Sequence, residues 1–192
     1  PTALSRALGV DPARTAAALA ATSLALVLSQ APDVLAGATL VSGWSWIPAA
    51  GLNATFRLDG FGLLFALLIL GIGLLVILYA RYYLSPEESK ERFYGLLLLF
   101  MGAMLGVVLA ENLLLLVTFW ELTSLSSFLL IGFWRHEADA RRGARLALMV
   151  TGAGGLALLA GVLLIGHVVG SFELSDVLAA GPVIKAHPLY ET

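Results

Sequence analysis

Five long stretches of the sequence carry almost no charge, and each is about as long as a lipid bilayer is thick. They cover residues 15–31, 61–80, 93–110, 112–134 and 146–166. A helix rises about 1.5 Å per residue, so roughly 20 apolar residues cross the ~30 Å hydrocarbon core. Strands of a membrane barrel would instead alternate over about ten residues. The continuous runs therefore predict an all-α, polytopic transmembrane helix bundle of about five spans.

Composition agrees with this prediction and excludes several functional classes. Hydrophobic residues make up 59% of the 192 residues and charged residues 12%, against roughly 45–50% and 25% in soluble domains. The 11 basic and 13 acidic residues are too balanced for a nucleic-acid-binding surface. The chain has no cysteine and its three histidines lie far apart in the sequence, so we expect neither a metal site nor a cofactor site.

The distribution of Lys and Arg predicts the orientation of the spans, because cytoplasmic segments retain these residues. If the N-terminus is cytoplasmic, the inner segments carry Arg6, Arg14, Arg81, Lys90, Arg92, Arg135, Arg141, Arg142 and Arg145. The outer segments then carry only Arg57 and Lys185. We therefore expect a cytoplasmic N-terminus and an outer tail at residues 167–192. The first residue is Pro1, which indicates a processed chain or a piece of a longer protein.

Two segments outside the spans have patterns of their own. The outer segment at residues 33–59 contains two short strand-like stretches, 43–47 and 53–58, around a turn at 48–51, and it is either a β-hairpin or a plain loop. Trp44 and Trp46 in it are typical of interfacial anchors. Residues 171–180 predict a short amphipathic helix, and Pro182 and Pro188 are expected to end regular structure. Gly102 and Gly106 form a small-xxx-small pair that favours close helix packing.

Glu121 is the one charged residue inside the apolar runs, and it lies near the middle of the run at 112–134. A charged residue at a helix centre costs about 2.5–3.5 kcal/mol on insertion scales, so a carboxyl group at this depth normally faces protein or water. Helical spacing places Thr118 and Ser124 one turn before and after it. Glu121 is therefore the candidate functional residue, with Thr118 and Ser124 as supporting hydroxyls.

Two roles for Glu121 fit this setting. Burial favours the neutral form of a carboxyl group and a nearby Lys or Arg favours the carboxylate, so a movable cationic partner would make Glu121 a proton relay. Alternatively, Glu121 stays neutral and anchors a neighbouring helix through a hydrogen bond. The other four runs contain no Lys, Arg, His or Asp, so a cationic partner would lie outside this chain.

Three motifs resemble the antiporter-like family of membrane subunits: RLDG at residues 57–60, LYARYYL at 78–84 and, above all, FWELTSLSSFLLIGF at 119–133. This family includes the proton-pumping subunits of respiratory complex I and the large A-type subunits of Mrp multisubunit Na⁺/H⁺ antiporters. The TSLSS stretch after Glu121 is closer to the Mrp A-type subunits. Gly152 and Gly155 point the same way, because complex I relatives carry Arg and Asp at these two positions.

The resemblance implies a role for Glu121 and a setting for the chain. Glu121 matches the acidic residue that, in the family, interacts with a lysine on a later helix and helps to move protons at mid-membrane depth. The chain resembles an N-terminal fragment that lacks the lysine helix. We expect one membrane domain fragment over residues 1–192 in a bacterial inner membrane, with lipid and other subunits of an antiporter complex as its partners and no prosthetic group.

Three functional hypotheses follow. The preferred one is part of a monovalent cation/proton antiporter subunit that exchanges H⁺ for Na⁺ or a similar cation, which makes the chain part of a transporter rather than an enzyme. The second is a proton-pumping membrane subunit of NADH-quinone oxidoreductase (complex I), in which redox activity would belong to the whole complex. The third is a structural scaffold segment in which Glu121 is a hydrogen-bonded anchor.

Overall fold

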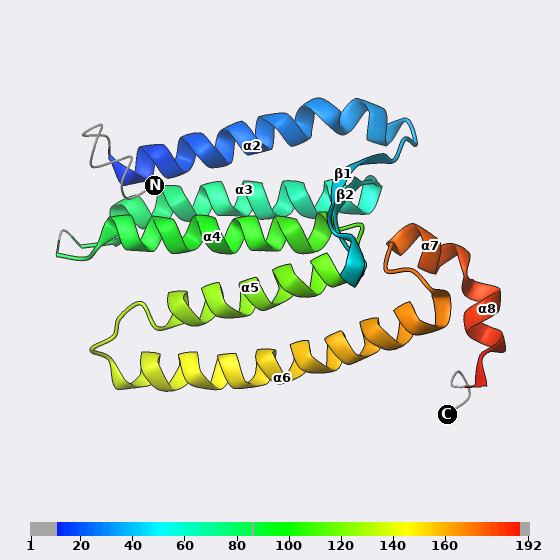
Figure 1. The fold of residues 1–192 in the computed structure, drawn as a ribbon. Helices are drawn as coiled ribbons and strands as arrows, with labels where there is room; N and C mark the ends of the chain where they lie inside the picture. The colour runs from blue at the N-terminus through cyan, green and yellow to red at the C-terminus, as the bar shows by residue number, and fades with distance from the viewer. Residues whose placement is uncertain (1–10, 86, 189–192) are drawn as a thin grey trace.

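The computed structural model describes residues 11–85 and 87–188 and shows five long helices with a small hairpin at one end (Figure 1). The order of elements is α2, β1, the short 3-10 helix η1, β2, α3, α4, α5, α6, α7 and α8. The hairpin, α7 and α8 lie at one end of the bundle, which we call the hairpin end. The α3–α4 and α5–α6 connections lie at the opposite end, which we call the loop end.

Each predicted span corresponds to one long helix. The five are α2 (Pro12–Leu35), α3 (Gly60–Tyr83), α4 (Lys90–Leu109), α5 (Leu113–Ile131) and α6 (Ala138–Val169), and all are long and apolar enough to cross a membrane. The predicted fold class, an all-α membrane bundle with a short β-hairpin, is confirmed. α5 is shorter than the apolar run at 112–134, because Asn112 caps its start and the backbone leaves the helix at Gly132.

α2 extends beyond the apolar run at 15–31, and its polar side chains do not interrupt it. The hydroxyls of Thr15, Ser23 and Ser29 each donate a hydrogen bond to a carbonyl about one turn earlier, at 2.9, 3.0 and 2.7 Å. Asp11 caps the helix by accepting the backbone N–H of Ala13 at 3.0 Å. These bonds satisfy these three hydroxyls within the helix, as a lipid environment requires. Arg6 and residues 189–192 lie outside the described residues.

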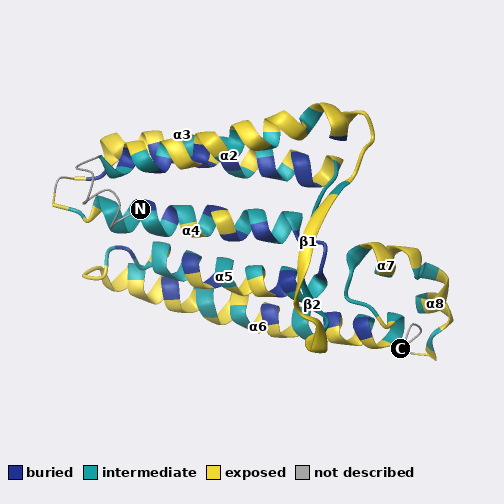
Figure 2. Cartoon of the chain, turned by 45° about the horizontal axis from the view of Figure 1, so that its top comes forward, coloured by how far each residue is buried: buried dark blue, intermediate teal, exposed yellow. Residues whose placement is uncertain are grey.

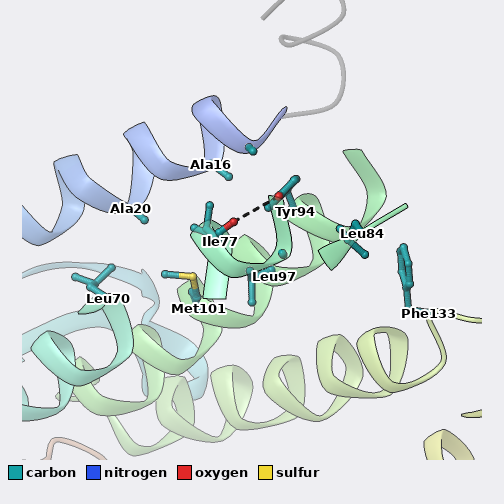
Figure 3. Packing of buried hydrophobic residues seen from close by; sticks show 11 residues of the cluster. Ala16, Ala20, Leu70, Ile77, Leu84, Tyr94, Leu97, Met101 and Phe133 are labelled. Carbon is teal, nitrogen blue, oxygen red and sulfur yellow. Dashed lines mark hydrogen bonds between the residues drawn. The ribbon is translucent and has the colours of Figure 1, made fainter. Parts of the chain in front are cut away.

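A buried cluster joins α2, α3 and α4 (Figure 3). The contribution of α2 is a face of alanines, and such small side chains let neighbouring helices approach closely. On the other side of the cluster, the buried Tyr94 hydroxyl of α4 donates to the carbonyl of Ile77 on α3 at 3.4 Å. Fully or largely buried members include Ala13, Ala16, Ala20, Leu70, Ile77, Tyr94, Leu97 and Met101.

The two members of the predicted glycine pair have different surroundings. A Cβ built on Gly106 would overlap the ring of Phe119 on α5, so the absence of a side chain at Gly106 allows α4 and α5 to pack closely. A Cβ built on Gly102 would meet nothing within 4 Å. The close approach therefore depends on Gly106 and not on the pair.

The segment between α2 and α3 is a hairpin, which decides between the two structures predicted for it. β1 (Leu40–Ile47) and β2 (Leu52–Leu58) pair antiparallel across η1 (Pro48–Ala50), with an irregularity between Ser45 and Ile47. Gly51 ends the turn in the left-handed region at φ 67°, a conformation that glycine adopts without strain. Trp44 and Trp46 are exposed on β1, which fits their predicted role as interfacial anchors.

After α6 the chain forms two short helices where one was predicted. α7 (Leu174–Ala179) falls inside the predicted stretch 171–180. α8 (Gly181–Ala186) follows directly, so the expectation that Pro182 ends regular structure was wrong. Proline is tolerated in the first turn of a helix, where its missing N–H has no intrahelical partner to lose.

Much of the outer surface of the helices is exposed (Figure 2), and many of the exposed residues are large and apolar. On α3, for example, Leu64, Ile72 and Leu75 are each more than half exposed. Soluble proteins rarely present such continuous apolar surface. These faces fit contact with lipid tails or with further membrane helices.

Candidate functional site

Glu121 lies near the middle of α5, on a side of the helix that contacts α6. At about 1.5 Å per residue it is roughly 12 Å from the start of α5, close to the centre of a ~30 Å hydrocarbon layer. Its side chain is exposed in the part of the protein that the structure describes. Within residues 11–85 and 87–188, the carboxylate forms neither an ion pair nor a hydrogen bond.

The nearest part of α6 is Gly155. A Cβ built on this glycine would overlap Oε1 of Glu121 and would lie 2.8 Å from its Cδ. It would also lie 3.4 Å from Cδ1 of the Trp120 ring. The carboxyl group of Glu121 therefore occupies space that exists because residue 155 has no side chain. The sequence singled out both residues, Glu121 from its depth and Gly155 from its departure from complex I relatives, but it gave no sign that they are in contact.

Thr118 and Ser124 lie on α5 near Glu121 but are bonded elsewhere. The Thr118 hydroxyl donates to the carbonyl of Leu114 at 2.9 Å, and the Ser124 hydroxyl donates to the carbonyl of Trp120 at 3.2 Å. Ser124 is buried, whereas Thr118 is exposed. Neither hydroxyl donates to Glu121 in this arrangement, and their supporting role stays a prediction.

A second polar cluster, at the hairpin end, was not predicted. The Glu173 carboxylate accepts hydrogen bonds from Nδ2 of Asn53 at 2.8 Å, from the hydroxyl of Thr55 at 2.8 Å and from Nδ2 of Asn112 at 2.9 Å. Nδ2 of Asn112 also donates to the carbonyl of Gly51 at 2.9 Å. One carboxylate thus joins the hairpin, the start of α5 and the segment before α7, and we call this group the Glu173 latch.

Asn112 belongs to the latch and to α5 at the same time. Its Oδ1 accepts the backbone N–H groups of Leu114 and Leu115 at 3.1 and 3.2 Å, the hydrogen-bond pattern of an N-cap. Asn112 is completely buried. The sequence prediction counted Asn112 as the first residue of a membrane span. Helical periodicity relates residues that are three or four positions apart, so it gives no sign of the Glu173 partner, which is 61 residues away.

Beside the latch, three charged residues meet at the hairpin end. Arg57 pairs with Asp59 at 3.1 Å, and its Nη1 lies 3.7 Å from Oε2 of the buried Glu111. The Asp59 carboxylate also caps α3 by accepting the N–H of Gly62 at 2.9 Å. This hydrogen bond is the largest cause of a lowered pKa for Asp59; burial opposes it and Arg57 adds to it. Arg57 and Asp59 are two of the residues in the RLDG motif at 57–60.

Neither the Glu121 site nor the Glu173 latch has the residues of a metal centre. Among the described residues, no three His, Cys, Asp or Glu side chains come together in an arrangement that would hold a metal ion. The Glu173 carboxylate is surrounded by neutral donors, which is typical of a structural anchor. Of the two sites, only the Glu121 site presents an uncommitted ionisable group at membrane depth.

Two family models match the chain. One is described as NADH-Ubiquinone oxidoreductase (complex I), chain 5 N-terminus, and matches residues 46–94. The other is described as NADH:quinone oxidoreductase/Mrp antiporter, TM, and matches residues 110–187. The second match includes α5, α6 and the residues of the Glu121 site.

Among curated proteins, a probable K⁺/H⁺ antiporter subunit of the A/B type from Rhizobium meliloti is 57% identical over 161 residues, which cover 84% of this chain and 16% of the relative. A Na⁺/H⁺ antiporter subunit of type A1 from Staphylococcus haemolyticus is 48% identical over 163 residues, which cover 85% of this chain and 20% of the relative. The chain thus spans a fifth or less of the length of these relatives.

Two solved structures have the same arrangement of helices. In the Mrp complex from Dietzia sp., the similar region covers 97% of this chain and 20% of the matched chain, with a TM-score of 0.82 and 34% identity. In an archaeal membrane-bound sulfane sulfur reductase, it covers 93% of this chain and 28% of the matched chain, with a TM-score of 0.74 and 20% identity. At 20% identity, the second likeness concerns the fold alone.

Proposed function

Because the chain belongs to the antiporter-like family of membrane subunits and matches the N-terminal part of the Mrp A-type subunits, we propose that it is part of a monovalent cation/proton antiporter subunit. The subunit would exchange H⁺ for Na⁺ or a similar cation across a bacterial inner membrane. Other subunits of a multisubunit complex and the lipid bilayer would be its partners. The names of the two curated relatives support this class of activity.

The observation that carries the proposed mechanism is the setting of Glu121. A carboxyl group at mid-membrane depth has no partner among the described residues and lies against a glycine on the next helix. Such a group exchanges protons readily when a movable cation approaches, because the cation stabilises the carboxylate and its departure favours the neutral acid. In the proposed relay, Glu121 releases a proton as a lysine of a later helix comes near and takes one up as that lysine moves away.

The charge distribution supports the proposed orientation. The described Lys and Arg residues of the predicted inner segments lie at the loop end, from Arg14 at the start of α2 to Arg145 in the first turns of α6. Arg57 and Lys185 lie at the hairpin end. By the positive-inside rule the loop end is cytoplasmic and the hairpin end is outside.

Transport in vesicles tests the relay directly. The full-length subunit with Glu121→Gln would be assembled with its partner subunits, and cation-induced collapse of a pH gradient would be measured in inverted vesicles. Gln keeps the shape of Glu and removes its proton exchange, so we expect antiport to be lost. Glu137→Gln is the matched control, because Glu137 is an exposed carboxylate at the N-terminus of α6, outside the membrane spans. Normal antiport in Glu121→Gln would contradict the relay.

The same pair of variants addresses the other two hypotheses. The match of residues 46–94 to a complex I model makes a proton-pumping subunit the second candidate, and transport would then depend on NADH oxidation and not on a cation gradient. If Glu121 is instead a scaffold anchor, Glu121→Gln transports normally while Glu121→Leu lowers the amount of assembled complex. Membrane abundance of the partner subunits measures that outcome.

A further inference from the structure

A basic cavity lies at the loop end, where α4, α5 and α6 meet. It has a volume of about 360 Å³ and is lined by Arg92, Arg135, Arg141 and Arg145 together with Phe128, Leu129, Gly132 and Ala144. None of the described residues that line it is acidic. The volume is within the range of about 300–1,000 Å³ that is usual for small-molecule sites.

The four arginines keep donors available for an anion. Arg145 uses only its Nε, which donates to the carbonyl of Arg141 at 3.3 Å. Arg141 uses Nη1, which donates to the carbonyls of Arg135 and His136 at 2.7 and 3.0 Å. None of the four forms an ion pair with any residue that the structure describes. Four guanidinium groups around one space, without a counter-charge, repel one another until an anion enters.

Arg92, on α4, has a separate contact that holds its side chain in place. Its Cζ lies 5.5 Å from the ring centroid of Phe133, which is a cation–π contact. The backbone of Arg141 lies in the first turn of α6, and its side chain closes the α5–α6 connection through the two carbonyl bonds. The cavity is therefore built by three separate elements.

The predicted topology puts the cavity at the depth of lipid headgroups. The 32 residues of α6 extend for about 48 Å, well beyond a ~30 Å hydrocarbon core, and the apolar run in α6 begins only at residue 146, so we expect the first turns of α6 to lie in the interfacial layer. One part of the lining is cationic and the other, with Phe128, Leu129 and Ala144, is apolar. A free inorganic anion has no apolar group to contact the apolar part of the lining. A phospholipid places its phosphate and its first acyl carbons side by side, so it can contact both parts. Basic pockets between membrane helices on the cytoplasmic side bind such headgroups.

We propose that this cavity binds the phosphate of an anionic phospholipid, with Arg92, Arg135, Arg141 and Arg145 as its ligands. The site is separate from Glu121, and lipid retention can be measured without transport. An arginine near an anionic lipid contributes about 1 kcal/mol, which corresponds to roughly fivefold in affinity. Removal of one arginine should weaken binding by about that factor, and removal of two should multiply the effects.

The test uses the whole antiporter complex with the full-length subunit, purified in detergent and titrated with phosphatidylglycerol while bound lipid is counted by native mass spectrometry. Arg92→Gln and Arg145→Gln should each weaken binding of one phosphatidylglycerol molecule about fivefold. Arg142→Gln is the matched control, because Arg142 is an exposed neighbour on α6 that does not line the cavity. Arg145→Lys keeps the positive charge and is included in case Arg145→Gln prevents assembly of the complex.

Several results would overturn the proposal. Unchanged binding in Arg92→Gln and Arg145→Gln would mean that the cavity is filled by another part of the complex. Equal weakening of phosphatidylglycerol binding in Arg142→Gln would show that the effect comes from the overall charge of the protein and not from this cavity. Equal retention of phosphatidylcholine would remove the role of a net negative headgroup, and displacement by inorganic phosphate at the same concentration would identify a soluble anion as the ligand.

Discussion

The carboxyl group of Glu121 fills the space that a side chain at Gly155 would need, since a Cβ built at that position overlaps Oε1 and lies 2.8 Å from Cδ. The contact joins the middle of α5 to the middle of α6. It makes Gly155 a positioning residue for the proposed relay, because the rotamer of Glu121 depends on the absence of a side chain there.

Gly155→Ala should lower antiport while leaving the complex assembled. Alanine is favoured over glycine in a helix by up to about 1 kcal/mol, so α6 itself is not weakened. The atom in the way is the end of a flexible side chain, which moves aside, and a displaced reacting group costs roughly tenfold to a hundredfold in rate. Vesicle antiport assays measure the loss. Gly152→Ala is the control, because a Cβ at Gly152 meets nothing within 4 Å; equal rates in the two variants would contradict a positioning role.

Asn112 should be essential for the stability of the hairpin end, for two separable reasons. Asn112→Ala removes both the N-cap of α5 and the bonds to Glu173 and Gly51, and should cost about 2–3 kcal/mol. Asn112→Ser keeps a capping oxygen and removes only the two Nδ2 bonds, so its cost should be smaller but not zero. Thermal unfolding of the purified complex and protease cleavage of the hairpin measure both. A Ser variant as stable as the wild type would show that the two Nδ2 bonds of Asn112, to Glu173 and Gly51, contribute nothing.

Asp59 should make the hairpin end sensitive to acid. Its pKa lies below the ordinary value of 3.8, chiefly because the Gly62 N–H donates to the carboxylate. The stability that the charged group contributes is therefore present above its ordinary pKa and is lost as the pH falls through its folded-state value. Asp59→Asn retains a capping oxygen but does not titrate, so its melting temperature should fall less than that of the wild type between pH 7 and about pH 3.

The control for this comparison is Asp33→Asn. The Asp33 side chain makes no hydrogen bond or ion pair with the described residues. Asp33→Asn should therefore lose as much stability on acidification as the wild type. An equal fall in all three proteins would mean that the cap at Asp59 does not respond to pH.

The sequence predicted features that depend on neighbours along the chain. Uncharged length identified the five helices, and a lone acid in a span identified Glu121 as the residue to explain. The start of α5 was missed by one residue, since Asn112 is a polar cap that lies directly beside a run of leucines. Pro182 was interpreted as a terminator because its position in a first turn depends on where α8 begins.

Features that depend on long-range packing were not predictable from one sequence. Asn112 and Glu173 meet because the α4–α5 turn and the end of α6 converge on the hairpin, and no local pattern records that convergence. Arg92 and Arg145 were interpreted only as markers of orientation, although the fold brings them to one cavity. The contact between Glu121 and Gly155 likewise depends on the register of α5 against α6, which the periodicity of either helix leaves open.

Infrared titration of the Glu121 carboxyl group in the intact complex tests the central claim most directly. Difference spectra across the accessible pH range would be compared between the wild type and Glu121→Gln, so that the carboxyl signal of this residue is isolated. A proton relay predicts a signal that changes with pH and with the presence of the transported cation. A carboxyl group that remains in a single protonation state throughout would contradict the account.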